Sequence, residues 1–219
     1  MTAFDIQDRP ENFQPVLISP NVSFPSLRRP LQLGIMASGN GTNFEAVVKA
    51  IADDRLNAEI RVLIYNNPHA QVKERAEKYN IPAILVDHRN YQQRENFDHE
   101  IVAVLKAYGA DWIVMAGWMR IITQVLLDSY PNRVINIHPS LLPSFKGIKA
   151  IEQALEAKVK ITGCTAHLVS LEIDSGEIIM QAAVPVLPED TTDTLHARIQ
   201  VQEHNILPQA IALAAKRFS

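Results

Sequence analysis

Between residues 31 and 137 the sequence alternates short β-rich runs with helical patterns, and few folds are compatible with that order. The β-rich runs LQLGIMA, EIRVLIY, PAILV, DWIVMAG and RVINI lie at 31–37, 59–65, 82–86, 111–117 and 133–137. Apolar residues at helical spacing fill the intervals at 43–51, 70–79 and 92–108. This order predicts a Rossmann-like, doubly wound α/β fold with a mostly parallel sheet and right-handed crossovers.

The pattern changes after about Lys160. Two β-rich runs at 162–171 and 177–187 are separated by the turn-like sequence IDSG, and a helix is expected at 194–215. Two strands with so short a link are typical of an antiparallel pair. We therefore expect antiparallel strands to be added to the parallel sheet near the C-terminus.

Composition excludes several classes of protein. A chain of 219 residues suits one domain, and its formal net charge of −3 argues against a protein that coats nucleic acid or anionic lipid. No run approaches the roughly 18 apolar residues of a membrane helix. We expect small-molecule substrates, with neither nucleic acid nor membrane as partner. Cys164 is the single cysteine, which favours a reducing compartment and a cytoplasmic location.

Residues 1–30 differ from the rest, because five of the 13 prolines fall there at every fifth position. No helix or strand is expected in this segment. Asp5 and Asp8 stand where a secretory signal would carry positive charge. We predict a proline-rich arm at 1–30, flexible or laid across the body, ahead of one domain at 31–219.

The segment SGNGTN at 38–43 follows the first expected strand and opens a helix. In such a turn the backbone N–H groups of the helix start favour a phosphate, with Gly41 allowing close approach and Thr42 or Asn43 capping the helix or holding the same phosphate. An ordinary turn with a cap is the alternative. A dinucleotide site is disfavoured because Phe44 stands where G-x-G-x-x-G needs its third glycine.

A second group of polar residues follows the strand at 133–137, at the sheet edge where open α/β folds bind ligands. Asn136 and His138 are two positions apart on an extended segment, so their side chains point the same way. An amide and an imidazole together suit an oxygen that becomes negative during a reaction. The alternative is a capping asparagine and a structural histidine. Asp174 lies in the IDSG turn and matters if the fold brings it near His138, since a carboxylate raises the pKa of an imidazole.

The segment AGWMRII at 116–122 ends another strand. Its apolar side chains suit a slot for a flat ring, although core packing is the usual role of such residues. Arg120 could bind a carboxylate or cap the sheet edge. Taken alone, Arg94 and Glu203 are expected to be solvated surface groups on helices. The histidines lack metal-ligand spacing, so no metal site is expected.

Together these segments resemble the folate-dependent phosphoribosylglycinamide formyltransferase family of purine synthesis. The likeness covers residues 31–208, and NIHPSLLPSFKG at 136–147 is its most specific part. SGNGTN, AGWMRI, NIHPSLLP, LEIDSG and QEH follow one another in the family's order. The resemblance implies a formyl transfer from 10-formyltetrahydrofolate, as co-substrate, to the amine of 5-phosphoribosylglycinamide, without a metal.

The resemblance also implies a role for individual residues. Asn136, His138 and Asp174 match the catalytic trio, with a protonated His138 and Asn136 stabilising the tetrahedral oxyanion. The loop that binds the substrate phosphate is matched by Gly41, Thr42 and Asn43. Glu203 matches a residue near the ribose and glycinamide. Matches to the folate side are Arg94, Met119, Arg120, Ile121, Ile122 and Asn136.

Two departures from the family concern the loops of the site. Lys149 stands where members often have histidine, and the late turn reads Asp174-Ser175-Gly176-Glu177 rather than Asp-Gly-Gly-Pro. A formyltetrahydrofolate deformylase shares the trio, but that family usually carries a ligand-sensing domain that 30 residues cannot form. A methionyl-tRNA formyltransferase would need a longer C-terminal domain. A non-catalytic nucleotide-binding module would keep SGNGTN without needing the trio.

Overall fold

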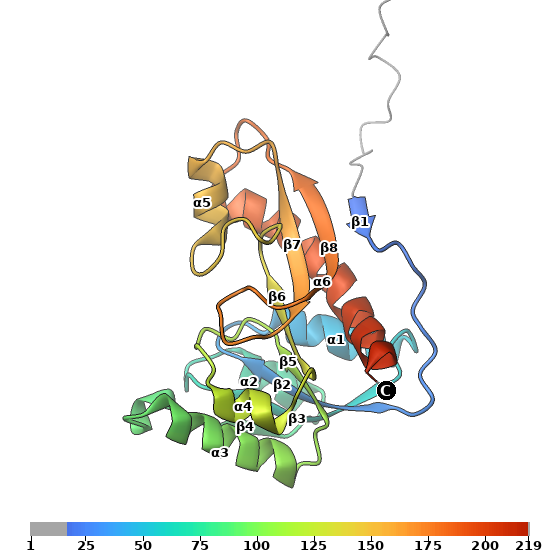
Figure 1. Cartoon of the computed structure of the whole chain (residues 1–219), viewed down its shortest axis with the longest axis vertical. Helices are drawn as coiled ribbons and strands as arrows, with labels where there is room; N and C mark the ends of the chain where they lie inside the picture. Colours follow the sequence, from blue (N-terminus) through green and yellow to red (C-terminus); the bar gives the residue numbers. More distant parts are fainter. Residues whose placement is uncertain (1–16, 219) are drawn as a thin grey trace, which may run out of the picture.

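A computed structural model describes residues 17–218 and contains a mixed sheet of eight strands (Figure 1). The strand order is β1-β8-β7-β6-β5-β2-β3-β4. Neighbours from β6 to β4 are parallel, whereas β6–β7, β7–β8 and β8–β1 are antiparallel. The strands span Leu17–Ser19 (β1), Leu31–Ala37 (β2), Ala58–Tyr65 (β3), Ala83–Leu85 (β4), Trp112–Met115 (β5), Val134–His138 (β6), Ile161–Leu168 (β7) and Ile178–Pro185 (β8).

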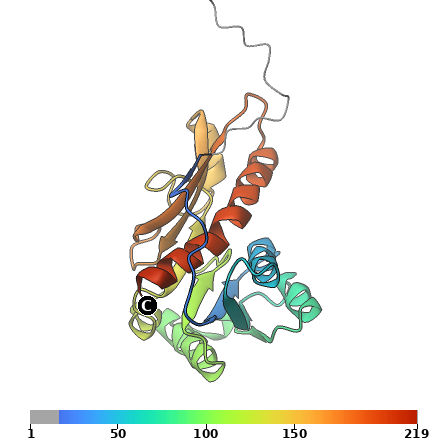
Figure 2. The same cartoon turned by 90° about the vertical axis from the view of Figure 1, so that its right-hand side faces the viewer.

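Helices cover both faces of the sheet. Successive strand residues point to opposite faces, and those on both faces are apolar and buried under helices. Leu33 and Ile35 of β2 pack into the core under α1, α2 and α6, whereas Met36 packs on the opposite face with α3 and α4. Figure 2 shows α6 running along the β7–β8 side. The helices are Thr42–Ala52 (α1), Val72–Lys78 (α2), Arg94–Ala107 (α3), Gln124–Ser129 (α4), Ala150–Glu156 (α5) and Thr192–Arg217 (α6), with a 3-10 turn at His88–Asn90.

The predicted fold class is confirmed, including the antiparallel strands near the C-terminus. All seven predicted strands and four predicted helices are present, with ends that differ by up to three residues. The helix expected at 194–215 is longer, since α6 begins at Thr192 with a capping box and continues through Pro208 to Arg217. Helices α4 and α5 were not predicted, because six or seven residues carry too few turns to show helical periodicity.

The expectation that residues 1–30 hold no strand is wrong at β1. Leu17–Ser19 pair with β8 as the edge strand, opposite 181–183. Further along, Phe24 and Leu27 pack against the core, and Asn57 Nδ2 donates a hydrogen bond of 3.2 Å to the Leu27 carbonyl. Residues 17–30 are therefore laid across the body. The part of the arm before residue 17 lies outside the described residues, and the domain boundary at residue 30 stays a prediction.

Within residues 17–218, no helix combines the length and the apolar composition that a membrane crossing requires.

Candidate active site

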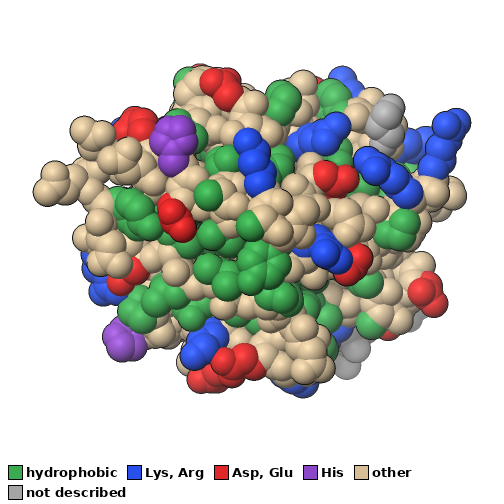
Figure 3. All heavy atoms as spheres, turned by 90° about the horizontal axis from the view of Figure 1, so that it is seen from below, with side chains coloured by type: hydrophobic (Ala, Val, Ile, Leu, Met, Phe, Trp, Pro, Cys, Tyr) green, Lys and Arg blue, Asp and Glu red, His purple; other side chains and the backbone are tan. Residues whose placement is uncertain are grey.

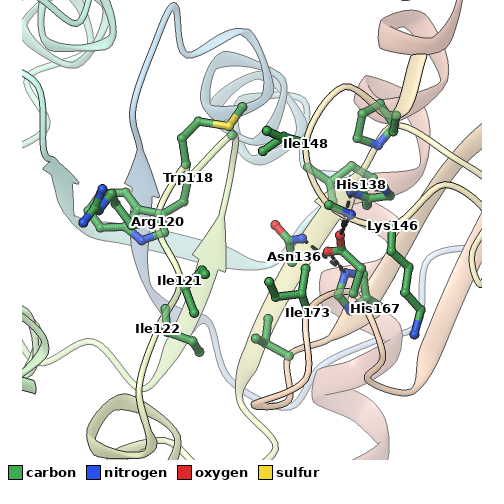
Figure 4. A pocket seen from close by; sticks show the side chains of 18 of the residues that line it. Trp118, Arg120, Ile121, Ile122, Asn136, His138, Lys146, Ile148, His167 and Ile173 are labelled. Atoms are coloured by element: carbon green, nitrogen blue, oxygen red, sulfur yellow. Dashed lines mark hydrogen bonds and ion pairs between the residues drawn. The ribbon is translucent and has the colours of Figure 1, made fainter. Parts of the chain in front are cut away.

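A cavity of about 650 Å³ opens at the carboxyl ends of β5 and β6, the sheet edge where ligands of open α/β folds bind (Figure 4). Four segments line it: residues 117–122 after β5, 136–139 at the end of β6, residues from 146 to 153 before and within α5, and residues from 167 to 174 at the end of β7 and after it. Asn136, His138 and Asp174 all line this cavity. The structure thus brings together three residues that are up to 38 positions apart in the sequence.

His138 and Asp174 form the closest polar contact of the predicted trio. Nδ1 of His138 lies 3.3 Å from Oδ2 of Asp174, and both side chains are largely buried. The Gly147 N–H donates a hydrogen bond of 2.8 Å to the same carboxylate oxygen. Asp174 itself has φ 48°, a left-handed conformation that aspartate tolerates in turns. The turn therefore directs this carboxylate at the end of β6.

The protonation of His138 follows from its two contacts. Nε2 lies 2.8 Å from the Phe145 carbonyl, which can only accept, so Nε2 carries a proton. Burial lowers the pKa of His138, while the Phe145 carbonyl and the Asp174 charge act in the opposite direction without cancelling it. The resting imidazole is therefore neutral near pH 7. A proton added at Nδ1 would lie beside the carboxylate of Asp174.

Asp174 stays ionised in this setting. Burial alone would raise its pKa, but the neighbouring His167 and His138 rings and the hydrogen bond from the Gly147 N–H outweigh burial and hold the pKa of Asp174 below its usual value. A neutral imidazole beside a carboxylate can take up a proton without leaving a buried charge unpaired. This pair is consequently suited to proton transfer.

His167 was missed by sequence reasoning and completes the cluster. Its Nδ1 donates to its neighbour's carbonyl, that of Leu168, at 2.8 Å, so Nε2 can accept a hydrogen bond of 3.2 Å from Asn136 Nδ2. The same Nε2 lies 3.7 Å from Oδ1 of Asp174. His167 therefore holds the Asn136 amide in place, and the second hydrogen on Asn136 Nδ2 remains available to donate. The feature that brings His167 to the site is the register of β6 with β7, which sets Asn136 opposite His167. That register cannot be read from the sequence of either strand alone.

Apolar side chains form the rest of the cavity wall. Met119 is 73% exposed and Ile121 is 49% exposed, and both line the cavity after β5. Ile148 and Ile173 line it from the segments before α5 and after β7 (Figure 4). Four exposed apolar side chains thus share one hollow, and a concave apolar surface of this kind suits a small-molecule ligand. Arg120 and the buried Ile122 also line the cavity.

Arg94 is placed differently from the other predicted folate-side residues. It begins α3, is exposed, and is not among the residues that line the cavity. The structure therefore does not bring Arg94 to the walls of the slot.

The 38–43 loop lies beside the cavity. The Ser38 N–H donates to the Gly117 carbonyl at 3.0 Å, and Ser38 Oγ accepts from the Met119 N–H at 2.9 Å. Gly41 is the N-cap residue of α1, with φ 73° and no side-chain cap. A Cβ at this position would lie 2.3 Å from Val72 Cγ2, so only glycine fits. The helix start thus presents backbone N–H groups in the way that binds phosphates.

Asn43 and Glu203 form a buried pair below that loop. Asn43 Nδ2 donates a hydrogen bond of 2.9 Å to Glu203 Oε2, and Asn43 Oδ1 has no partner in the described part of the chain. The expectation that Glu203 is a solvated surface group is wrong, because it is only 5% exposed. Burial raises the pKa of Glu203. The packing of α1 on α6 causes this burial, and the sequence of α6 does not reveal it.

The two departures from the family's pattern, Lys149 and the turn at 174–177, lie at or next to the site. Lys149 lines the cavity and has φ 60°, while Glu177 pairs with Arg217 outside it. Lys146 instead joins the two loops, since its Nζ contacts Glu172 at 3.3 Å and also Ser175 Oγ. Among residues 17–218, no group of three or more His, Cys, Asp or Glu side chains is arranged to hold a metal ion.

Comparison with protein families matches residues 32–211 to the family described as formyl transferase. The phosphoribosylglycinamide formyltransferase of Bacillus subtilis is 39% identical over 180 residues, which cover 82% of this chain and 92% of the relative. The human trifunctional purine biosynthetic protein adenosine-3 is also 39% identical, but the chain spans only 19% of its length. The crystal structure of glycinamide ribonucleotide transformylase 1 from Symbiobacterium toebii has a TM-score of 0.85 at 41% identity, over 90% of this chain and 94% of that one.

Proposed function

This chain belongs to the formyl transferase family, and we propose that it moves the formyl group of 10-formyltetrahydrofolate to the amine of 5-phosphoribosylglycinamide. One observation carries the proposal: the Asn136 amide and the His138–Asp174 pair converge at the end of an apolar slot. That slot lies beside the 38–43 loop, whose helix start suits a phosphate. The apolar slot suits a folate ring, the polar trio suits a formyl carbon, and the loop beside them suits a phosphorylated amine.

Each substrate end is assigned to its own wall. Met119, Arg120, Ile121 and Ile122 face the folate from the 117–122 segment. The backbone at Gly41, with Thr42 and Asn43, holds the phosphate, and Glu203 stands near the ribose and glycinamide through Asn43. Thr42 Oγ1 already accepts a hydrogen bond of 3.1 Å from Gln200, so it contributes to the loop's shape as well.

The reaction follows from these positions. The neutral amine attacks the formyl carbon, the carbonyl electron pair moves to oxygen, and a tetrahedral intermediate forms. The free Nδ2 hydrogen of Asn136 donates to that oxyanion. His138 takes up a proton at Nδ1 from the amine, directly or through water, and the resulting imidazolium is paired with Asp174. When the carbon–nitrogen bond to folate breaks, the same proton goes to the departing folate nitrogen.

This sequence of steps differs from the one expected from the resemblance. A protonated His138 was expected at the outset, whereas burial lowers the pKa of His138 and favours the neutral imidazole in the resting site. The imidazolium then forms during the reaction. We further propose that the chain acts on small molecules in the cytoplasm, since its one cysteine, Cys164, is buried and forms no disulfide.

The test of the function is an assay of the folate product. The full chain is mixed with 10-formyltetrahydrofolate, with and without 5-phosphoribosylglycinamide, and tetrahydrofolate release is followed. We expect release that depends on the amine and matches formylated product one to one. Release at the same rate without the amine would identify a deformylase, and no release in either mixture would favour a non-catalytic binding module.

A second expected result concerns the 38–43 loop. Gly41→Ala places a Cβ against Val72 at a left-handed backbone position, so the loop must shift. We expect the KM for 5-phosphoribosylglycinamide to rise at least tenfold, which corresponds to about one lost charge-assisted hydrogen bond. Gly39→Ala is the matched control, because a Cβ there meets nothing within 4 Å. Steady-state kinetics check both. Equal KM values, or equal affinity of the wild type for the dephosphorylated ribonucleoside, would remove the phosphate from this loop.

A further inference from the structure

A second cavity, of about 590 Å³, lies at the end of the sheet opposite to the active site. It is bounded by the starts of β2 and β5, the residue before β6, the end of α6, and residues 26–29 of the arm. The active site lies at the carboxyl ends of β5 and β6, so the two cavities share no lining residue. We refer to this second cavity as the basic cleft.

Positive charge dominates the basic cleft. Among the described residues that line it, four are cations, namely Arg28, Arg29, Arg133 and Lys216, and one, Asp111, is a carboxylate. The C-terminal end of α6 adds a partial negative charge of roughly 0.5. An excess of more than two positive charges remains, in a chain whose net charge is −3. Figure 3 shows blue Lys and Arg side chains gathered on the right-hand part of the underside, the side where the C-terminus lies in Figure 1.

The one carboxylate is already engaged. Asp111 Oδ2 lies 3.5 Å from Arg29, and its Oδ1 accepts a hydrogen bond of 3.0 Å from the Gln32 N–H. Among the residues that the structure describes, Arg28, Arg133 and Lys216 have no carboxylate within ion-pair distance. Three cations without a counter-charge repel one another around one hollow, and an anion bound between them relieves that repulsion.

From this geometry we propose that the basic cleft binds the di- or triphosphate group of a small molecule. Guanidinium groups bind phosphate oxygens through paired hydrogen bonds, and two or three phosphates match the number of unpaired cations better than one carboxylate does. The volume lies within the roughly 300–1,000 Å³ range of small-molecule sites. Trp112 and the half-buried Phe218 form apolar wall, which strengthens the attraction by excluding water.

Part of the cleft lies outside the family's shared part, although Asp111, Trp112 and Arg133 lie within it. The family match covers residues 32–211, whereas Arg28, Arg29 and Lys216 lie outside it. A bound polyphosphate would bridge Arg28 of the arm to Arg133 and Lys216 of the body, and so fasten residues 26–29 onto the domain. The proposal does not depend on the proposed function, because no residue of the active site takes part.

Calorimetric titration of the full chain with inorganic pyrophosphate tests the proposal, with ADP as a second arm. We expect saturable binding in dilute buffer that weakens in 1 M salt, where the screening length is about 3 Å. Arg133→Gln and, independently, the exposed Arg28→Gln should each weaken binding about tenfold or more. Lys160→Gln, an exposed lysine outside both cavities, is the matched control and should change binding less than twofold.

The two arms separate the sources of the phosphate group. Equal affinity for pyrophosphate and ADP means that the phosphates alone are recognised, and tighter ADP binding means that the cleft takes a nucleotide; either result supports the proposal. Binding that is unchanged in both arginine variants, or absent in the wild type, would overturn it. A single-stranded oligonucleotide that binds more tightly than pyrophosphate and depends on Arg133 would overturn the small-molecule assignment.

Discussion

Replacing Asn136 by alanine is expected to lower kcat for formyl transfer by roughly 10²–10³-fold, the loss that follows removal of one oxyanion donor. Asn136 Nδ2 is held by His167, which leaves one hydrogen for the developing oxyanion. That interaction strengthens only when the carbonyl oxygen becomes negative, so KM values should change little. Steady-state kinetics with both substrates measure the effect.

The matched control is Gln124→Ala, which removes another side-chain amide. Gln124 is exposed and lies outside the cavity, where its side-chain amide donates a hydrogen bond to Asp128 within α4. We expect wild-type kcat in this variant. A turnover number for Asn136→Ala within twofold of the wild type, with folded protein, would contradict the oxyanion role of Asn136.

Asp174→Asn is the second substitution with a large expected effect. It removes the charge that offsets the burial of His138, so the pKa of His138 should fall further below its usual value. The imidazolium formed in the reaction then lacks its partner, and kcat should fall by roughly 10²–10⁴-fold, the range that general acid–base catalysis contributes. NMR titration of the His138 ring and kcat as a function of pH measure the two effects.

The pH dependence has a defined sign. His138 acts as a base in its neutral form, so kcat of the wild type should fall as pH drops through the lowered pKa of His138, which lies below 6.5. Glu172→Gln is the control, since Glu172 belongs to the same turn but pairs with Lys146 at the surface. An unshifted His138 pKa in Asp174→Asn, or an equal rate loss in Glu172→Gln, would rule out the coupling.

The sequence predicted the parts of the molecule in which local pattern and function coincide. The strand predicted at 133–137, which is Val134–His138 in the structure, places Asn136 and His138 at one edge, and strand alternation then turns both toward one cavity. The glycines of SGNGTN predict a turn between a strand and a helix, and the structure has such a turn, with Gly41 at φ 73°. These features depend on a few neighbouring residues, which is why they can be read from the chain.

Contacts between distant segments could not be read in the same way. His167 faces Asn136 only because β7 pairs with β6 in one register, and a shift by one residue would turn His167 to the other face. Glu203 is buried because α6 packs on α1, 160 residues away from its partner Asn43. The short edge strand at Leu17–Ser19 forms through pairing with β8 rather than through its own pattern.

The most direct test of the whole site compares His138→Ala, Asp174→Asn and the double variant in the same transfer assay. If both side chains act in the same proton transfer at one carbonyl, the free-energy costs of the two single substitutions are not additive in the double variant. We predict that the double variant turns over within about threefold of His138→Ala alone. Losses in kcat that multiply in the double variant would show that the two groups act independently, and would contradict the proton-transfer pair.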